Sequence, residues 1–190
     1  MTERQQGRLV HDLEGATVRQ EWGTVRENPI RLDPEEAARM VEELNACHAG
    51  AFNLFYLVRK HYWTAEGAEY GDVADFLEDA YRRLREISDA FAQRIVEIGG
   101  VPASTPPDLQ KYSPVHLEAE HLYDLRASLE GDLDAYATLV ASIRDAVGVA
   151  KGLGDEGSRE LLEDRLAELE ADTDQLDDYL EDDTRTEGAR

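Results

Sequence analysis

Cysteine, lysine and long apolar runs are all scarce in this chain of 190 residues. The single cysteine, Cys47, excludes an intrachain disulfide, and its position in a helical pattern indicates a small buried side chain. No apolar run approaches the roughly 18 residues that cross a bilayer, and the stretch from Met1 to Gly15 lacks the apolar core of a signal peptide. We therefore expect a single-domain, cytoplasmic protein with no membrane partner.

Basic residues are also in short supply, since 20 of them face 42 acidic residues and leave a formal net charge of −22. Lysine occurs only at Lys60, Lys111 and Lys151. An acidic surface repels the phosphates of nucleic acid, so the charge argues against DNA as a partner or allows only weak binding. We interpret it as a solvated halophilic surface, adapted to high salt, in preference to a specific cation-binding surface.

The stretch 1–32 lacks apolar periodicity, so we expect an N-terminal tail that is mobile or docks on a neighbour. It is the least acidic part of the chain and the one candidate for a nucleic-acid-binding arm. Its arginines are Arg4, Arg8, Arg19, Arg26 and Arg31.

A strong helix start lies at Asp33, because aspartate caps free amides and the following Pro34 suits a first helical turn. Apolar residues then recur at alternating steps of four and three, which predicts a helix over 34–63 with one inward stripe. That stripe comprises Ala37, Val41, Leu44, His48, Ala51, Phe55, Val58 and Tyr62. The imidazole of His48 needs a hydrogen-bond partner in such a seam, and we expect Tyr136 or Tyr56 to supply it.

The same periodicity predicts helices over 73–98, 116–151 and 155–180. Between the first two of these, 101–114 holds four of the six prolines and cannot form a long helix, although one short turn is expected near Leu109 to Tyr112. Four long helices with one long connection predict an all-α, ferritin-like antiparallel four-helix bundle. The bundle is expected over 33–181, followed by an acidic tail over 182–190.

Several motifs resemble the Dps family, the small ferritin-like proteins that store iron and protect DNA during starvation. One is the run from Arg59 to Tyr70 (RKHYWTAEGAEY), and another is the run from Ser88 to Pro102, which ends in Gly-Gly-Val-Pro. The resemblance is closest to the acidic haloarchaeal members and covers about 32–184. It implies a hollow homo-oligomer of 12 subunits that binds iron (Fe²⁺/Fe³⁺), acts as a ferroxidase and limits oxidative stress.

The resemblance also implies iron-oxidising sites between twofold-related subunits. In the family a histidine precedes the tryptophan of the first helix, but here that position holds Tyr62. A second histidine falls on Ala74, and the glutamate four residues after the family aspartate is replaced by Gln93. Asp89 matches the family aspartate. The resemblance leaves four candidate metal ligands, which are Asp89, Glu78, Asp75 and His61.

Two function hypotheses follow from this pattern. The first is an iron-sequestering shell with an altered ferroxidase site. The second is a ferroxidase-silent shell that serves as a structural or cargo-binding subunit, in some cases mixed with an active paralogue. Arginines stand where the family places cavity glutamates, at Arg82, Arg83 and Arg85, and one of them is expected to pair with an acid at helical spacing. A further metal site is conceivable at His116, Glu120 and His121.

Overall fold

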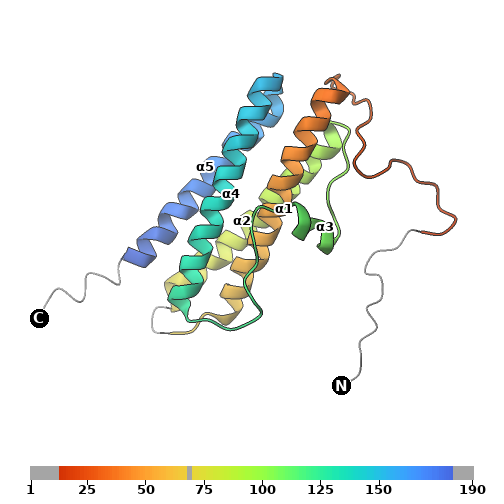
Figure 1. Cartoon of the computed structure of the whole chain (residues 1–190). Coiled ribbons are helices and arrows are strands. Elements are labelled where there is room, and N and C mark those ends of the chain that lie inside the picture. The colour runs from red at the N-terminus through yellow and green to blue at the C-terminus, as the bar shows by residue number, and fades with distance from the viewer. Residues whose placement is uncertain (1–12, 68–69, 182–190) are drawn as a thin grey trace, which may run out of the picture.

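The computed structural model describes residues 13–67 and 70–181, and within these residues it is all-helical. The expected acidic tail over 182–190 and the first part of the expected N-terminal tail, 1–12, lie outside the described residues. The long helices pack side by side as a bundle, and a short helix lies at its side (Figure 1). The long helices are α1 (Pro34–Thr64), α2 (Tyr70–Glu97), α4 (Leu125–Leu153) and α5 (Glu156–Glu181), and the short one is α3 (Pro106–Tyr112).

The first helix begins where the sequence predicts. The side chain of Asp33 accepts hydrogen bonds from the amides of Glu35 and Glu36, and Pro34 occupies the first turn. Helix α2 packs antiparallel to α1, and α4 and α5 form a second antiparallel pair. The predicted ferritin-like arrangement of two helix pairs joined by a long connection is confirmed.

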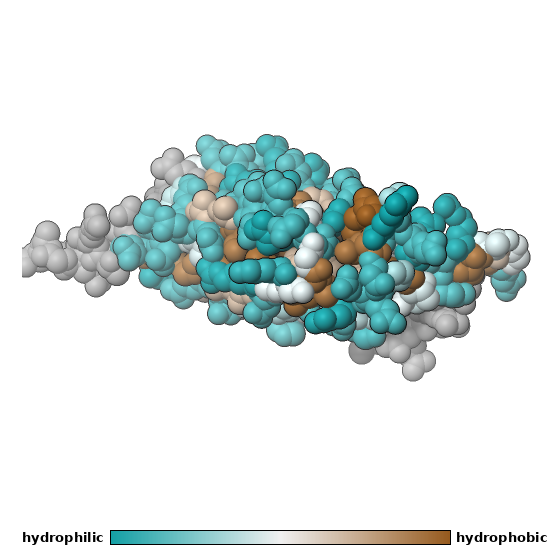
Figure 2. All heavy atoms as spheres, turned by 90° about the horizontal axis from the view of Figure 1, so that it is seen from above, coloured by the Kyte–Doolittle hydropathy of each residue, from teal (hydrophilic) through white to brown (hydrophobic). Residues whose placement is uncertain are grey.

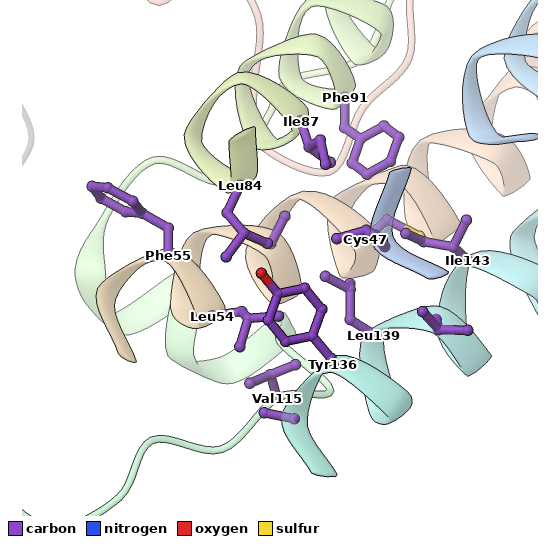
Figure 3. Packing of buried hydrophobic residues seen from close by; sticks show 14 of the residues in the cluster. Cys47, Leu54, Phe55, Leu84, Ile87, Phe91, Val115, Tyr136, Leu139 and Ile143 are labelled. Atoms are coloured by element: carbon purple, nitrogen blue, oxygen red, sulfur yellow. The ribbon is translucent and has the colours of Figure 1, made fainter. Parts of the chain in front are cut away.

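The core lies between the helix pairs and is almost entirely aliphatic and aromatic. Figure 3 shows the side chain of Tyr136, from α4, packed in the core near Leu54 of α1 and Leu84 of α2. The sulfur of Cys47 lies near Ile143 in the same core, and burial raises the pKa of this thiol to about 12. The predicted buried cysteine is therefore confirmed, and its thiol stays protonated and unreactive.

The connection between α2 and α4 contains the short predicted turn, which is helix α3. The predicted start of the next helix at His116 is wrong, because α4 begins only at Leu125 after an N-cap by Asp124. The intervening residues run along the bundle, where Glu118 forms an ion pair with Lys60. Leu122, in the same stretch, is 77% exposed. The apolar periodicity of this stretch is misleading because a polar contact with α1 holds the chain extended.

The N-terminal segment from Gln20 to Leu32 docks on its own chain. The carbonyl of Gly99 accepts hydrogen bonds from the Arg26 amide at 3.0 Å and from the Gln20 side chain at 2.8 Å. Nearby, the ring of Trp22 contacts that of Tyr112 at 5.7 Å between centroids. This segment therefore closes the end of the bundle at which α2 ends.

The surface is dominated by hydrophilic residues, with small hydrophobic patches between them (Figure 2). Among the described residues no helix combines the length and the apolar character that a membrane crossing requires.

Candidate metal centre

The predicted ligands Glu78 and Asp89 lie on one face of α2. They are eleven positions apart (89 − 78), which is about three turns, so both side chains project from the same side of the helix. Asp89 is exposed and lines a shallow groove of about 460 Å³ together with Gln93 and Val96. Glu78 forms an ion pair with Arg82 one turn further along, as expected for helical spacing.

Asp75 belongs to a different surface. It lines a groove of about 420 Å³ between α2 and α5, together with Asp79, Arg83 and Tyr179. Asp75 precedes Asp89 by fourteen positions, about 21 Å along the helix axis, and does not line the groove that contains Asp89. Asp75 is exposed, so a cation in solvent could reach it.

His61 is not near either groove. Its side chain is only 2% exposed, and it lies between two carboxylates on other parts of the fold. Nδ1 contacts Oδ2 of Asp132 on α4 at 2.8 Å, and Nε2 contacts Oε1 of Glu118 in the connection at 3.0 Å. Both ring nitrogens are therefore engaged, and neither offers a lone pair to a metal in this arrangement.

The electrostatics of this cluster favour a bound proton. Burial alone would lower the pKa of His61, but hydrogen bonds and charge from Asp132 and Glu118 outweigh burial and raise it above the ordinary 6.5. Burial raises the pKa of the Asp132 carboxyl, which is 0% exposed and whose Oδ1 has no hydrogen-bond partner. Partial burial would raise the pKa of Glu118, but hydrogen bonds from Lys60 and His61 lower it. His61 is thus best described as an imidazolium that is held between the carboxylates of Asp132 and Glu118.

The two substituted histidine positions are filled by packing. Tyr62 is half-buried and its ring contacts that of Tyr81 on α2 at 5.4 Å between centroids. Ala74 is 7% exposed and offers no ligand atom. Within one chain the four candidate ligands therefore do not converge, and the described residues contain no group of three metal-binding side chains.

A second polar network crosses the bundle, and no local sequence pattern indicates it. Arg83 donates to both carboxylate oxygens of Asp172 on α5, at 3.2 Å and 2.6 Å. The hydroxyl of Tyr136 donates to the same carboxylate at 3.4 Å. Burial raises the pKa of Asp172 despite its partner Arg83, and burial raises the pKa of Tyr136 well above its ordinary value. This arginine is occupied by a structural ion pair, whereas Arg85 is exposed.

His48 is a satisfied core histidine, although the expected tyrosine partners are wrong. Its Nε2 lies 2.9 Å from the carbonyl oxygen of Ala103, and its Nδ1 lies 2.9 Å from the hydroxyl of Ser88. Nδ1 also lies 2.9 Å from the carbonyl oxygen of Ser88, so each ring nitrogen has a hydrogen-bond partner and the tautomer sets which nitrogen donates. The imidazole ties α1 to α2 and to the connection.

The alternative metal site at His116, Glu120 and His121 falls in the extended connection. All three side chains are exposed, and they do not share the helical turn that the alternative required.

Similarity to known proteins agrees with this helical architecture. The ferritin-like domain family matches residues 41–186. The DNA protection during starvation protein of Halobacterium salinarum is 38% identical over 161 residues, which cover 84% of this chain and 88% of that protein.

Solved structures give the same picture. A Dps homologue from Halobacterium salinarum superposes with a TM-score of 0.84 at 34% identity, over 87% of this chain and 93% of that one. The Dps protein of Vibrio cholerae, described as a member of a broad superfamily of ferritin-like diiron-carboxylate proteins, superposes with a TM-score of 0.76 at 25% identity, over 85% of this chain and 99% of that one.

Proposed function

Because the chain belongs to the ferritin-like family and, within it, to the Dps proteins, we propose that it is the subunit of a homo-oligomeric shell that binds and sequesters iron. In this proposal the shell limits peroxide damage, and its iron-oxidising step is altered. The observation that carries the proposal is the pair of carboxylates that remains on the outward face of α2. Asp89 is exposed beside Gln93, and Glu78 lies three turns away on the same face.

Iron is the cargo and substrate here, and carboxylate oxygens suit it. Asp89 is exposed and has no ion pair among the described residues, so its carboxylate is free to bind a cation. Glu78 can bind iron only if its ion pair with Arg82 breaks. Breaking this exposed ion pair costs about 0.5 kcal/mol. Glu78 and Asp89 of one chain are separated by about 16 Å along the helix axis, so they bind one iron together only if they come from two different subunits. Two carboxylates and a neutral amide bind iron more weakly than a set that includes imidazole. We therefore propose a weak, solvent-open site at which bound ferrous iron is oxidised slowly.

The experiment is anaerobic titration of the purified assembly with ferrous iron, followed by mixing with peroxide in a stopped-flow spectrometer. We expect oxidation that saturates at a fixed ratio of iron to subunit and that falls about tenfold in Asp89→Ala. The matched control is Asp164→Ala, which removes an exposed carboxylate from α5 and leaves the rate unchanged. A rate equal to that of iron in buffer alone would exclude the iron-oxidising part of the proposal.

The second candidate is a ferroxidase-silent shell, alone or mixed with an active paralogue. Its support is the buried engagement of His61 and the aromatic packing of Tyr62, which remove imidazole from the face that carries Asp89. A cargo role for the three arginines has less support, because Arg82 and Arg83 are paired with Glu78 and Asp172. Iron that binds without accelerated oxidation favours this candidate.

DNA compaction, which the names of the relatives suggest, has the least support in this chain. The described N-terminal arginines, Arg19, Arg26 and Arg31, are exposed, but the chain as a whole carries a net charge of −22. We propose no DNA-binding role beyond weak contact at low salt.

A further inference from the structure

Tyr62 and Tyr81 form an aromatic pair between the first two helices. Their ring centroids lie 5.4 Å apart with an angle of 52° between the ring planes, inside the range of about 4.5–7 Å for contacting rings. Both side chains are half-buried against the core. Two phenols from different helices are therefore held side by side, with limited access for solvent.

Further aromatic rings connect this pair to the surface. Tyr81 contacts Phe55 at 6.2 Å, and Phe55 contacts Tyr56 at 5.3 Å. The guanidinium of Arg59 lies over Phe55, Tyr56 and Trp63 at 4.6, 4.9 and 4.7 Å from the ring centroids. Tyr56 is 45% exposed and Trp63 is 64% exposed. The pair is thus part of a contiguous aromatic cluster that includes the buried Phe55 and the exposed Tyr56 and Trp63.

The pair also lies beside the proposed iron face. Glu78 precedes Tyr81 by three positions on α2, less than one turn, and the guanidinium of Arg82 lies 6.0 Å from the ring centroid of Tyr81. The sole thiol does not compete for oxidants, because Cys47 is buried in the core with its pKa raised to about 12. Tyr81 is therefore an oxidisable group within one turn of Glu78 on this helix.

We propose that Tyr62 and Tyr81 are an oxidation site, which traps hydroxyl radicals and joins the two helices through a dityrosine bond. The source of radicals rests on the proposed function: ferrous iron gives one electron to peroxide, and the products are ferric iron, hydroxide and a hydroxyl radical. Each radical takes a hydrogen atom from one phenol and becomes water. The two phenoxyl radicals then couple through ring carbons beside the oxygens, and the displaced ring hydrogens return to the oxygens.

The balance of this step is two phenols and two hydroxyl radicals giving one dityrosine and two waters. The chain loses two hydrogen atoms and gains one carbon–carbon bond between α1 and α2. Formation of this bond consumes two damaging radicals per subunit. It also cross-links α1 to α2, the helix that carries the iron face.

The test oxidises the intact assembly in two ways. One arm uses ferrous iron with peroxide, and the other uses light with a ruthenium photo-oxidant and persulfate, which needs no iron. Digestion after acidic residues then releases Tyr81 alone in the segment 80–86, apart from Tyr62. Mass spectrometry of chains that still migrate as single subunits on a denaturing gel identifies the linked segments.

Both arms are expected to yield a link from the segment 80–86 to the segment that contains Tyr62, with the loss of two hydrogen atoms. Tyr62→Phe and Tyr81→Phe each abolish this product and keep the apolar ring. Tyr179→Phe is the matched control, since Tyr179 is also half-buried but its aromatic neighbour is Phe76, at 5.5 Å. This variant retains the full yield.

Absence of the link in the ruthenium arm overturns the inference, because the rings are then not positioned to couple. A link in that arm alone also overturns it, because oxidants from iron do not reach the pair. If the link is absent although iron is bound and oxidised, the inference fails and the proposed function stands. A link that persists in Tyr62→Phe assigns the product to another tyrosine and likewise overturns it.

Discussion

At the scale of single residues, the cluster of His61, Asp132 and Glu118 needs one proton more than a neutral imidazole and two carboxylates hold. Each ring nitrogen faces a carboxylate oxygen, and a neutral ring donates only one hydrogen bond. The proton resides on His61 or is shared with Asp132, whose pKa is also raised. Both shifts have the same sign, so the folded chain holds this proton more tightly than the unfolded chain.

A pH dependence of stability follows from this sign. Because the pKa of His61 is higher in the folded chain than in the unfolded chain, protonation of His61 stabilises the fold. This contribution is complete below a pH of about 6.5 and is lost as the pH rises through the raised pKa. We expect His61→Gln to cost about 2 kcal/mol of unfolding free energy near pH 6 and less than about 1 kcal/mol near pH 9. Urea denaturation of both proteins across this range, at one protein concentration, measures the difference. A cost that does not change with pH would contradict the assignment.

The ion pair between Arg83 and Asp172 is a second prediction at this scale. Asp172 is almost completely buried, and removal of Arg83 leaves its carboxylate without a counter-ion. We expect Arg83→Leu to lower the unfolding free energy by about 2 kcal/mol, a figure reduced for the partial exposure of the arginine.

The matched change is Arg144→Leu, which removes an exposed ion pair with Glu170 and is expected to cost less than about 0.5 kcal/mol. Equal costs for the two arginine variants, measured by urea denaturation, would show that Asp172 is solvated or bound elsewhere.

Prediction from the sequence is weakest at the scale of residues. The substitutions at Tyr62, Ala74 and Gln93 are visible because a motif surrounds them, but the burial of His61 is not. Its partners Glu118 and Asp132 lie 57 and 71 positions away, and periodicity within one helix carries no information on such contacts. The same reason hides the contact between Arg83 and Asp172, which spans 89 positions.

At the scale of elements, the docked N-terminal segment depends on Gly99. This glycine has a φ of 91°, and a Cβ at its position would collide with the backbone carbonyl of Arg26. We expect Gly99→Ala to release the segment 20–32, because the change strains the backbone and displaces the stretch of chain that covers it. Hydrogen–deuterium exchange of this segment checks the prediction, with faster exchange as the expected result.

Gly131→Ala serves as the control for this change. Gly131 lies within α4, and a Cβ there meets no atom within 4 Å. Alanine should therefore stabilise the helix by about 0.5–1 kcal/mol and leave exchange of the segment 20–32 unaltered. Unchanged exchange in Gly99→Ala as well would mean that the segment is held by other contacts.

Elements with strong local signals can be predicted well. Asp33 and Pro34 mark the start of α1 correctly because capping is a local interaction. The predicted start of α4 is nine positions early, at 116 instead of 125, because the true N-cap, Asp124, is less conspicuous than the apolar residues before it. What holds those residues out of the helix is the tertiary contact of Glu118 with Lys60 and His61.

At the scale of the whole molecule, the net charge of −22 governs how stability responds to salt. Repulsion between like charges destabilises the compact state, and salt shortens its range from about 10 Å at 0.1 M to about 3 Å at 1 M. We expect the melting temperature to rise steadily with sodium chloride concentration up to at least about 1 M. Scanning calorimetry of the assembly tests this, and a melting temperature that is flat or falls with salt would show that attractive surface ion pairs outweigh the repulsion.

We propose above all that this chain forms a Dps-type iron shell whose oxidation step is slowed by the loss of ligands at defined positions. The most direct measurement restores two of them, with Tyr62→His and Gln93→Glu in one chain, and leaves Ala74 unchanged because it is buried and a histidine there would overpack the core. Stopped-flow oxidation of bound ferrous iron by peroxide is then compared with the parent protein. We expect an acceleration of at least about tenfold that is lost again on Asp89→Ala. An equal rate in the parent and the restored chain would contradict the proposal, since the substituted positions would then not be what limits iron oxidation.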